Sequence, residues 1–267
     1  MNLGFQFKQF FVRHDRCAMK VGTDGVLLGC WSGYDAAAAG SPTIPLRYHY
    51  ARCLDIGTGS GLIALMLAQR FPDALIDAID IDKAAVEQAA ENFAASPWSD
   101  RLHAFHARLQ EWQSHSVPSL EGRVREGFYS LIVSNPPYFQ NSLKNPDKGR
   151  QTARHTDTLS FSELIHHSTR LLSENGILAL ILPAEAESEV CELAQAEGLS
   201  LTRITRVYSK ESKPARRVLL AFEKSKSRNT DISTSRNTAP VEDTLVLEDE
   251  KGGRSAAYRE LTKDFYL

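Results

Sequence analysis

Residues Asn135-Pro136-Pro137-Tyr138 form a tetrapeptide that could do chemistry on an amino nitrogen. An amine conjugated to a ring or a carbonyl is a weak nucleophile, because its lone pair is delocalised. The side-chain carbonyl of Asn135 and the backbone carbonyl of Pro136 can accept from its two N–H bonds and so favour a pyramidal transition state. The prolines restrict the backbone and preorganise these acceptors, while Tyr138 can stack on a flat substrate. The alternative is a rigid turn after a strand, with no chemical role.

A glycine-rich turn precedes the tetrapeptide and is expected to bind a ligand. It lies between a predicted strand at 52–56 and a predicted helix at 62–70, where glycine lets the chain turn sharply and lets a ligand approach the backbone. A dinucleotide fingerprint would place its third glycine at position 62, which is Leu62. The turn therefore indicates a ligand without a pyrophosphate, and its candidate binding residues are Asp55, Gly57, Thr58, Gly59 and Gly61.

Two acidic residues, Asp80 and Asp82, end the next predicted strand at 75–81. A carboxylate at this position can accept from both hydroxyls of a ribose, so Asp80 is the candidate that binds a nucleoside. Asp82 is expected to cap the helix at 83–95. The alternative is that both are exposed acids in a turn.

Strands and helices are predicted to alternate through most of the chain. Further buried strands are expected at 102–107, 129–133 and 176–182, with a helix at 159–172, and this alternation predicts a parallel sheet covered on both faces. Two more strand candidates, 199–208 and 216–222, have no helix between them and are expected to pair antiparallel at the sheet edge. Residues 34–50 and 225–240 are interpreted as loops, the second of them flexible.

The glycine turn with its preceding acid resembles motif I of the class I methyltransferases. This resemblance implies an α/β, Rossmann-like fold with a seven-stranded, mostly parallel sheet, an antiparallel edge strand and helices on both faces. It also implies S-adenosylmethionine as cofactor. The family tends to place Asp or Asn beside the adenine of the cofactor, after the third strand; this chain has Arg108 there. The expected organisation is an N-terminal extension (1–33, a strand hairpin and a helix), a core (51–224) and a C-terminal segment (241–267).

A resemblance that covers more of the chain narrows the range of possible substrates. Residues 7–12 and 14–29, with Ser96-Pro97-Trp98, 217–222 and 265–267, resemble the bacterial tRNA adenine-N6 methyltransferases that modify the adenine 3′ to the anticodon of a valine tRNA. The resemblance implies that Lys20, Thr23 and Asp24 lie near the methionine part of the cofactor. The alternative for Thr23-Asp24 is a helix N-cap for 25–31.

Other functions stay open on the residues alone. The tetrapeptide does not choose between adenine N6, guanine N2 of RNA and a glutamine side chain of a protein. A module that binds cofactor and RNA but has lost catalysis is the alternative of a different class. A nicotinamide-dependent oxidoreductase is disfavoured by Leu62. The chain shows neither a separate target-recognition domain nor the helical N-terminal domain of the glutamine methyltransferases.

Charge favours a polyanionic partner in one region. The net charge of the 267 residues is −2, but residues 203–228 hold nine basic and two acidic residues and so carry +7. An anticodon loop is the expected partner, and its candidate contacts are Lys8, Arg13, Arg16, Lys144, Lys148, Arg150, Arg154, Arg216 and Arg217.

The remaining features suit a cytoplasmic protein. No apolar run approaches the roughly 18 residues that span a bilayer, and the N-terminus has no apolar signal core. The four cysteines are widely spaced, which predicts free thiols and no metal site. No obligate protein partner is evident.

Overall fold

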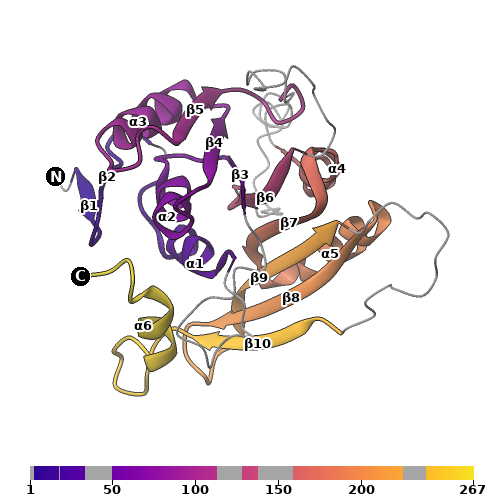
Figure 1. Ribbon diagram of the computed structural model, residues 1–267. Coiled ribbons are helices and arrows are strands. Elements are labelled where there is room, and N and C mark those ends of the chain that lie inside the picture. Colours follow the sequence, from indigo (N-terminus) through magenta and orange to yellow (C-terminus); the bar gives the residue numbers. More distant parts are fainter. Residues whose placement is uncertain (1–2, 18, 34–49, 113–127, 138–158, 225–238) are drawn as a thin grey trace, which may run out of the picture.

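An eight-stranded sheet forms the centre of the protein in a computed structural model that describes residues 3–17, 19–33, 50–112, 128–137, 159–224 and 239–267 (Figure 1). The strand order is β10-β8-β9-β7-β6-β3-β4-β5, and β9 is the strand that runs antiparallel to its neighbours. The strands are β3 (Arg52–Ile56), β4 (Leu75–Asp80), β5 (Leu102–His106), β6 (Tyr129–Ser134), β7 (Leu172–Pro183), β8 (Leu199–Tyr208), β9 (Ala215–Lys224) and β10 (Val241–Val246).

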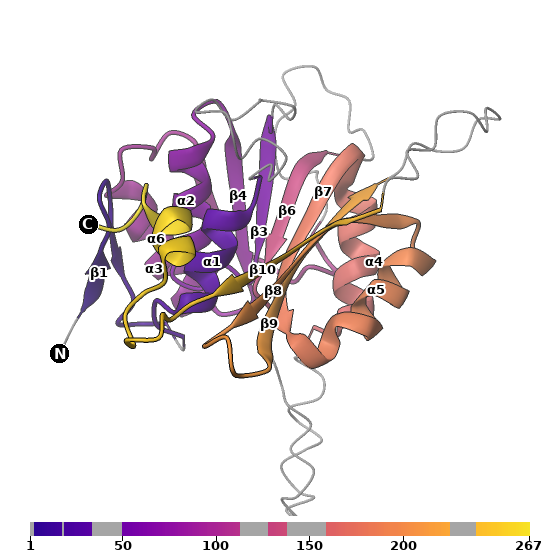
Figure 2. The ribbon, with the colours of Figure 1, turned by 90° about the horizontal axis from the view of Figure 1, so that it is seen from below.

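Helices cover both faces of the sheet, as expected for apolar strands without hydrophobic alternation (Figure 2). Successive strand residues alternate between the two cores, so that Cys53 lies in one and Leu54 in the other. The first core is covered by α1 (Thr23–Trp31), α2 (Leu62–Arg70), α3 (Lys83–Ala94) and α6 (Ala256–Thr262). The second is covered by α4 (Phe161–Leu171) and α5 (Glu187–Ala196), with a short 3₁₀ turn, η3 (Ala184–Ala186), before α5.

The sheet has one strand more than the seven predicted, because β10 comes from the C-terminal segment and pairs parallel with β8. The antiparallel pairing of β8 with β9 is confirmed, but β10 lies outside that pair and forms the edge. Arg203 of β8 donates to Asp243 of β10 at 2.9 Å. Leu245 is the one buried residue among the six of this strand, so the apolar pattern is too weak to predict a strand here.

The two ends of the chain pack together. Strands β1 (Gly4–Gln6) and β2 (Phe11–Arg13) form an antiparallel hairpin. Phe7 stacks on Phe10 and on Tyr266, with ring centroids 4.7 and 5.8 Å apart, and Phe10 contacts Trp98 edge-on at 5.7 Å. The backbone N–H of Lys8 donates to the Phe265 carbonyl at 2.8 Å. Three segments that resemble the tRNA adenine-N6 methyltransferases, 7–12, 96–98 and 265–267, therefore contribute aromatic residues to one cluster.

Helix α1 lies close to α2 because two glycines of α1 face α2. A Cβ at Gly29 would lie 2.5 Å from Sδ of Met66, and a Cβ at Gly25 would lie 3.1 Å from Leu62 Cδ2. Leu62 is the first residue of α2, directly after the glycine turn. The absence of these two side chains thus fixes the first turn of α1 beside the glycine turn.

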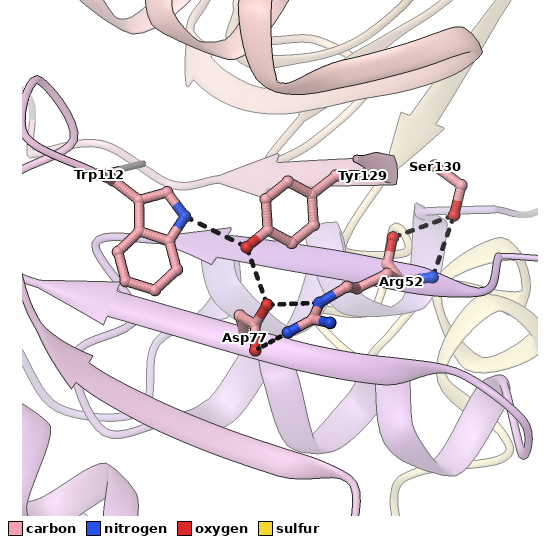
Figure 3. Close-up of polar contacts among 5 residues, drawn as sticks. All are labelled: Arg52, Asp77, Trp112, Tyr129 and Ser130. Carbon is pink, nitrogen blue, oxygen red and sulfur yellow. Dashed lines mark hydrogen bonds and ion pairs between the residues drawn. The ribbon is translucent and has the colours of Figure 1, made fainter. Parts of the chain in front are cut away.

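A buried polar network joins neighbouring strands of the sheet (Figure 3). Asp77 of β4 receives hydrogen bonds from Nε of Arg52 on β3, at 2.7 Å, and from the Tyr129 hydroxyl on β6, at 2.8 Å. The Trp112 indole N–H donates in turn to that hydroxyl at 3.2 Å. Trp112 belongs to the segment after β5, so the network ties this segment to three strands.

Candidate functional site

The carboxyl ends of β3, β4 and β6 bring the predicted site residues to one edge of the sheet. Ile56 at the end of β3 lies opposite Ser134 of β6 and Ile79 of β4 in register. The Ser134 hydroxyl donates to the Ile56 carbonyl at 2.9 Å. Asn135 follows Ser134 directly, and Gly57 follows Ile56, so the tetrapeptide begins beside the glycine turn.

The glycine turn connects β3 to α2 and is hydrogen-bonded to the end of β4. The backbone N–H groups of Gly57 and Thr58 donate to the Ile79 carbonyl at 2.9 and 3.1 Å. Gly57, Gly59 and Gly61 have φ values of 72°, 55° and 81°, a left-handed conformation that other residues rarely adopt. The turn is thus a defined backbone feature and not an irregular loop.

The three glycines serve different purposes. Among the described residues, a Cβ at Gly57 or at Gly59 would meet nothing within 4 Å, so there is room for a ligand beside both. A Cβ at Gly61 would lie 2.5 Å from the ring of Phe93 on α3. The first two glycines therefore leave an open cradle beside the turn, and the absence of a side chain at the third lets α3 pack closely.

Asp55 is fully buried under this cradle. Its Oδ2 accepts from the Thr58 hydroxyl at 2.7 Å and from the Ala64 N–H at 3.2 Å, whereas Oδ1 has no partner among the described residues. Burial, reinforced by the charge of Asp80, raises the pKa of Asp55 to about 7. A buried acceptor without a partner fits a ligand that carries positive charge or N–H donors.

Asp80 and Asp82 lie at the end of β4 with distinct contacts. Asp80 accepts from the Gly59 N–H through Oδ2 and from the Asp82 N–H through Oδ1, both at 2.9 Å. Asp82 is the N-cap of α3, and its side chain accepts from the Ala84 N–H at 2.9 Å, which confirms the predicted cap. The Asp80 carboxylate is held at the glycine turn and keeps acceptor sites for two hydroxyls.

Arg108 follows β5 at the next position along the edge. The Ala107 N–H donates to the Asp80 carbonyl at 3.0 Å, which places Arg108 beside the end of β4. Its side chain is exposed. Buried Leu109 and Trp112 anchor the rest of this segment in the second core.

The alternative of a side-chain cap at Thr23-Asp24 is wrong. Helix α1 begins at Thr23, its N-cap is Gly22, and no side chain caps it. Asp24 instead accepts from Nε of Arg217 on β9 at 2.8 Å. Lys20, in the segment before α1, is exposed. The side chain of Asp24 is thus engaged by a distant strand and not by its own helix.

Comparison with known proteins decides the family. The model of the methyltransferase small domain matches residues 42–197. A tRNA1(Val) (adenine(37)-N6)-methyltransferase from Flavobacterium johnsoniae is 43% identical, over 98% of this chain and 99% of its own. One from Pectobacterium carotovorum is 40% identical, over 99% of this chain and 94% of its own. The chain belongs to the tRNA1(Val) (adenine(37)-N6)-methyltransferase family.

Solved structures show the same fold. A predicted O-methyltransferase from Agrobacterium tumefaciens has a TM-score of 0.60 and 16% identity, and the match covers 91% of this chain and 96% of that one. A protein described as a class I S-adenosylmethionine-dependent methyltransferase from Listeria monocytogenes has a TM-score of 0.54 and 14% identity, covering 87% and 70%. The class I methyltransferase fold predicted from the glycine turn is confirmed.

The tetrapeptide of this tRNA methyltransferase family member is described only in part. Asn135 is partly buried, Pro136 is buried and Pro137 is exposed. Tyr138 lies outside the described residues, as do Lys144, Lys148, Arg150 and Arg154. The structure therefore places Asn135 at the edge beside the glycine turn and leaves the predicted role of Tyr138 as a prediction.

Most described residues of the predicted RNA surface already have partners. Arg13 pairs with Asp15 at 3.5 Å, Arg16 pairs with Glu91, and Lys8 donates to the Lys263 carbonyl at 2.6 Å. Arg206, within the basic stretch, pairs with Glu187 and Glu242 at 2.6 and 3.0 Å. Acidic residues of α5 and β10 thus neutralise part of the charge of 203–228. Arg216 is exposed.

Two contacts at the site were not predicted. Asn92 of α3 donates to the carbonyls of Ser60 and Arg13, both at 2.8 Å, and accepts from the Arg13 N–H at 2.9 Å. It thereby joins the glycine turn to β2. The second contact is the pairing of Arg217 with Asp24. Both join residues far apart in the chain, so no local pattern could have indicated them.

Neither a membrane span nor a metal cluster is found in the described part of the chain. No helix there is long and apolar enough to cross a bilayer. No group of three or more His, Cys, Asp or Glu residues there could hold a metal ion. All four cysteines are free, and Cys30 and Cys53 are buried.

Proposed function

We propose that this protein transfers the methyl group of S-adenosylmethionine to N6 of adenine 37, the adenine 3′ to the anticodon of tRNA1(Val). The observation that supports this best is the position of Asn135, one residue past the Ser134–Ile56 hydrogen bond and next to the open cradle of Gly57 and Gly59. An acceptor for an amino group and a site for a methyl donor therefore adjoin each other.

The residues fit the parts of the cofactor one by one. Asp80 accepts from the ribose hydroxyls, and Gly57 and Gly59 let the ligand approach the backbone. Lys20, Thr23 and Asp24 lie near the methionine end, Asp55 supports it from below the turn, and Arg108 borders the adenine. S-adenosylmethionine supplies a methyl group on a sulfonium, which loses its charge in the transfer. A carboxylate-rich site suits that cation.

The tetrapeptide prepares the nucleophile. The Asn135 side-chain carbonyl and the Pro136 backbone carbonyl would accept from the two N–H bonds of N6 and direct its lone pair at the methyl group of the cofactor. As the N6–carbon bond formed, the sulfur–carbon bond would break, S-adenosylhomocysteine would leave and N6 would release one proton to solvent. Pro137 keeps the backbone rigid, and Tyr138 stacks on the adenine. Preorganised acceptors of this kind contribute on the order of 10²–10³ in rate.

An anticodon loop suits this site because its bases are already single-stranded. Moving one of them into a pocket costs little compared with opening a duplex. The RNA contacts are expected from exposed Arg216 and from Lys144, Lys148, Arg150 and Arg154 after the tetrapeptide. A cytoplasmic location, where tRNA is present, stays a prediction.

Nucleoside analysis tests the substrate. Total tRNA from a strain that lacks the activity is incubated with the purified protein and S-adenosylmethionine, digested and examined by mass spectrometry. N6-methyladenosine is the expected product. N2-methylguanosine in its place would show a guanine methyltransferase. If the protein binds cofactor and RNA but forms no methylated nucleoside, the proposed function is wrong.

A further inference from the structure

Arg217 and Asp24 form an ion pair that joins the N-terminal extension to the site edge of the sheet. The guanidinium Nε donates to Asp24 Oδ2 at 2.8 Å, and Nη1 donates to the Arg216 carbonyl at 2.9 Å. The two residues are 193 positions apart. These two hydrogen bonds therefore fix the orientation of the Arg217 guanidinium.

The strand register places Arg217 of this pair at the edge of the sheet where the tetrapeptide begins. Arg217 on β9 lies opposite Pro183, the last residue of β7. Three residues earlier, Leu180 of β7 lies opposite Ser134 of β6, and Asn135 follows Ser134. Arg217 thus stands beyond the end of β6, on the side of the sheet where the tetrapeptide begins.

The glycine contacts place Asp24 near the glycine turn. Gly25 lies against Leu62, which directly follows the glycine turn, and Asp24 is the residue before Gly25. The side chain of Asp24 is 28% exposed and that of Arg217 is 34% exposed, so the pair lines an accessible surface. Asp24 is consequently held between the glycine turn and the end of β9.

We propose that Arg217 is a positioning residue that holds the Asp24 carboxylate against the α-amino group of bound S-adenosylmethionine. This inference rests on the proposed function, since the place of Asp24 near methionine is part of it. A carboxylate has two acceptor oxygens, so an ion pair at Oδ2 leaves Oδ1 to accept from the ligand. The ion pair with Asp24 therefore gives Arg217 a role in cofactor binding, whereas the sequence predicted that Arg217 contacts RNA.

Two ligands that differ in their α-amino group distinguish this role from a general loss of structure. S-adenosylhomocysteine carries the α-amino and carboxylate groups, and 5′-methylthioadenosine lacks both. Arg217→Met should weaken binding of S-adenosylhomocysteine about threefold to tenfold, the effect of losing one charge-assisted contact. Binding of 5′-methylthioadenosine should not change. A loss of general structure would weaken both ligands.

Calorimetry with the full chain tests the proposal. Arg217→Lys should restore part of the affinity, because it keeps the charge without the second donor. In an Asp24→Asn background, Arg217→Met should have no further effect, since two residues of one interaction are not additive. The KM for S-adenosylmethionine should rise in Arg217→Met, while the KM for tRNA stays the same.

Arg206→Met is the matched control. Arg206 lies on the neighbouring strand, is 34% exposed and pairs with Glu187, whose side chain is 26% exposed. Arg206 lies opposite Val218, the residue after Arg217, so its side chain lies on the other face of the sheet from that of Arg217. Its loss removes the ion pairs with Glu187 and Glu242 and should leave both affinities unchanged.

Three results would overturn the proposal: unchanged affinity for S-adenosylhomocysteine in Arg217→Met, equal weakening of both ligands, or additive effects of the two substitutions. An increase confined to the KM for tRNA would show that Arg217 contacts RNA instead. Failure of the wild-type protein to bind S-adenosylhomocysteine would refute the proposed function itself, so the two failures are distinguishable.

Discussion

The Asp80 carboxylate accepts a hydrogen bond from the Gly59 backbone N–H at 2.9 Å, so the end of β4 is fixed to the glycine turn. A second N–H, from Asp82, holds the other oxygen at 2.9 Å. The carboxylate is therefore oriented before a ligand arrives, and binding a ribose needs no rearrangement of this side chain. Preorganisation of this kind lowers the free-energy cost of binding.

Asp80→Ala should weaken S-adenosylmethionine binding at least about tenfold, the usual effect of losing hydrogen bonds to a charged acceptor. Calorimetry measures the dissociation constant. Asp82→Ala is the control: it loses the cap of α3, costs about 1 kcal/mol of stability and leaves the dissociation constant unchanged. Wild-type affinity in Asp80→Ala would contradict the assignment.

Asp55 should make cofactor binding depend on pH near neutrality. Burial raises its pKa from 3.8 to about 7, so the folded protein binds a proton that the unfolded chain has released. The stability conferred by this protonation is full below about pH 4 and is lost as pH rises through 7. A cationic ligand favours the ionised carboxylate, and the affinity for S-adenosylmethionine should increase from pH 6 to pH 8.

The dissociation constant at pH 6, 7 and 8 measures this effect. Asp55→Asn should flatten the profile, because the amide keeps an acceptor for Thr58 and Ala64 but does not titrate. An equally steep profile in Asp55→Asn would show that another group is responsible.

Tyr129→Phe should destabilise the fold without removing any residue of the site. The hydroxyl donates to buried Asp77 and accepts from Trp112, and its loss leaves the indole N–H without that acceptor. A cost of about 1–3 kcal/mol is expected. Urea unfolding measures it, and Tyr208→Phe, at a half-exposed tyrosine of β8, should stay within about 0.5 kcal/mol. Equal stability of the two variants would contradict the account of the network.

The sequence predicted the core elements because their signals are local. Buried strands such as β3 and β6 are short apolar runs, and the glycine turn needs positive φ values that few other residues adopt. The Asp82 cap depends on residues within one helical turn. Each of these features is determined by neighbours in the chain, so a single sequence reveals it.

The remaining features depend on contacts between distant residues. β10 joins the sheet through pairing with β8, including the bond from Arg203 to Asp243, and only one of its six residues is buried. The basic stretch suggested an RNA surface, but acidic residues of α5 and β10 neutralise part of it. Aspartate is a common N-cap residue, but Asp24 pairs with Arg217 and does not cap its helix. Such outcomes follow from tertiary packing, which no local pattern encodes.

Asn135→Ala should separate chemistry from cofactor binding. The substitution removes an acceptor for N6 but leaves the glycine turn and Asp80 intact. The rate of methyl transfer should fall about 10²–10³-fold, while the dissociation constant for S-adenosylmethionine stays within twofold. Single-turnover kinetics and calorimetry measure the two quantities. A normal rate in this variant would refute the role of the tetrapeptide.

Transfer of a labelled methyl group to two versions of tRNA1(Val) tests whether the protein methylates a single adenine. One version carries adenine 37, and in the other that base is replaced by guanine. We expect about one methyl group per molecule on the first tRNA, recovered as N6-methyladenosine at position 37, and none on the second. Equal labelling of both, or label recovered at another position, would contradict it.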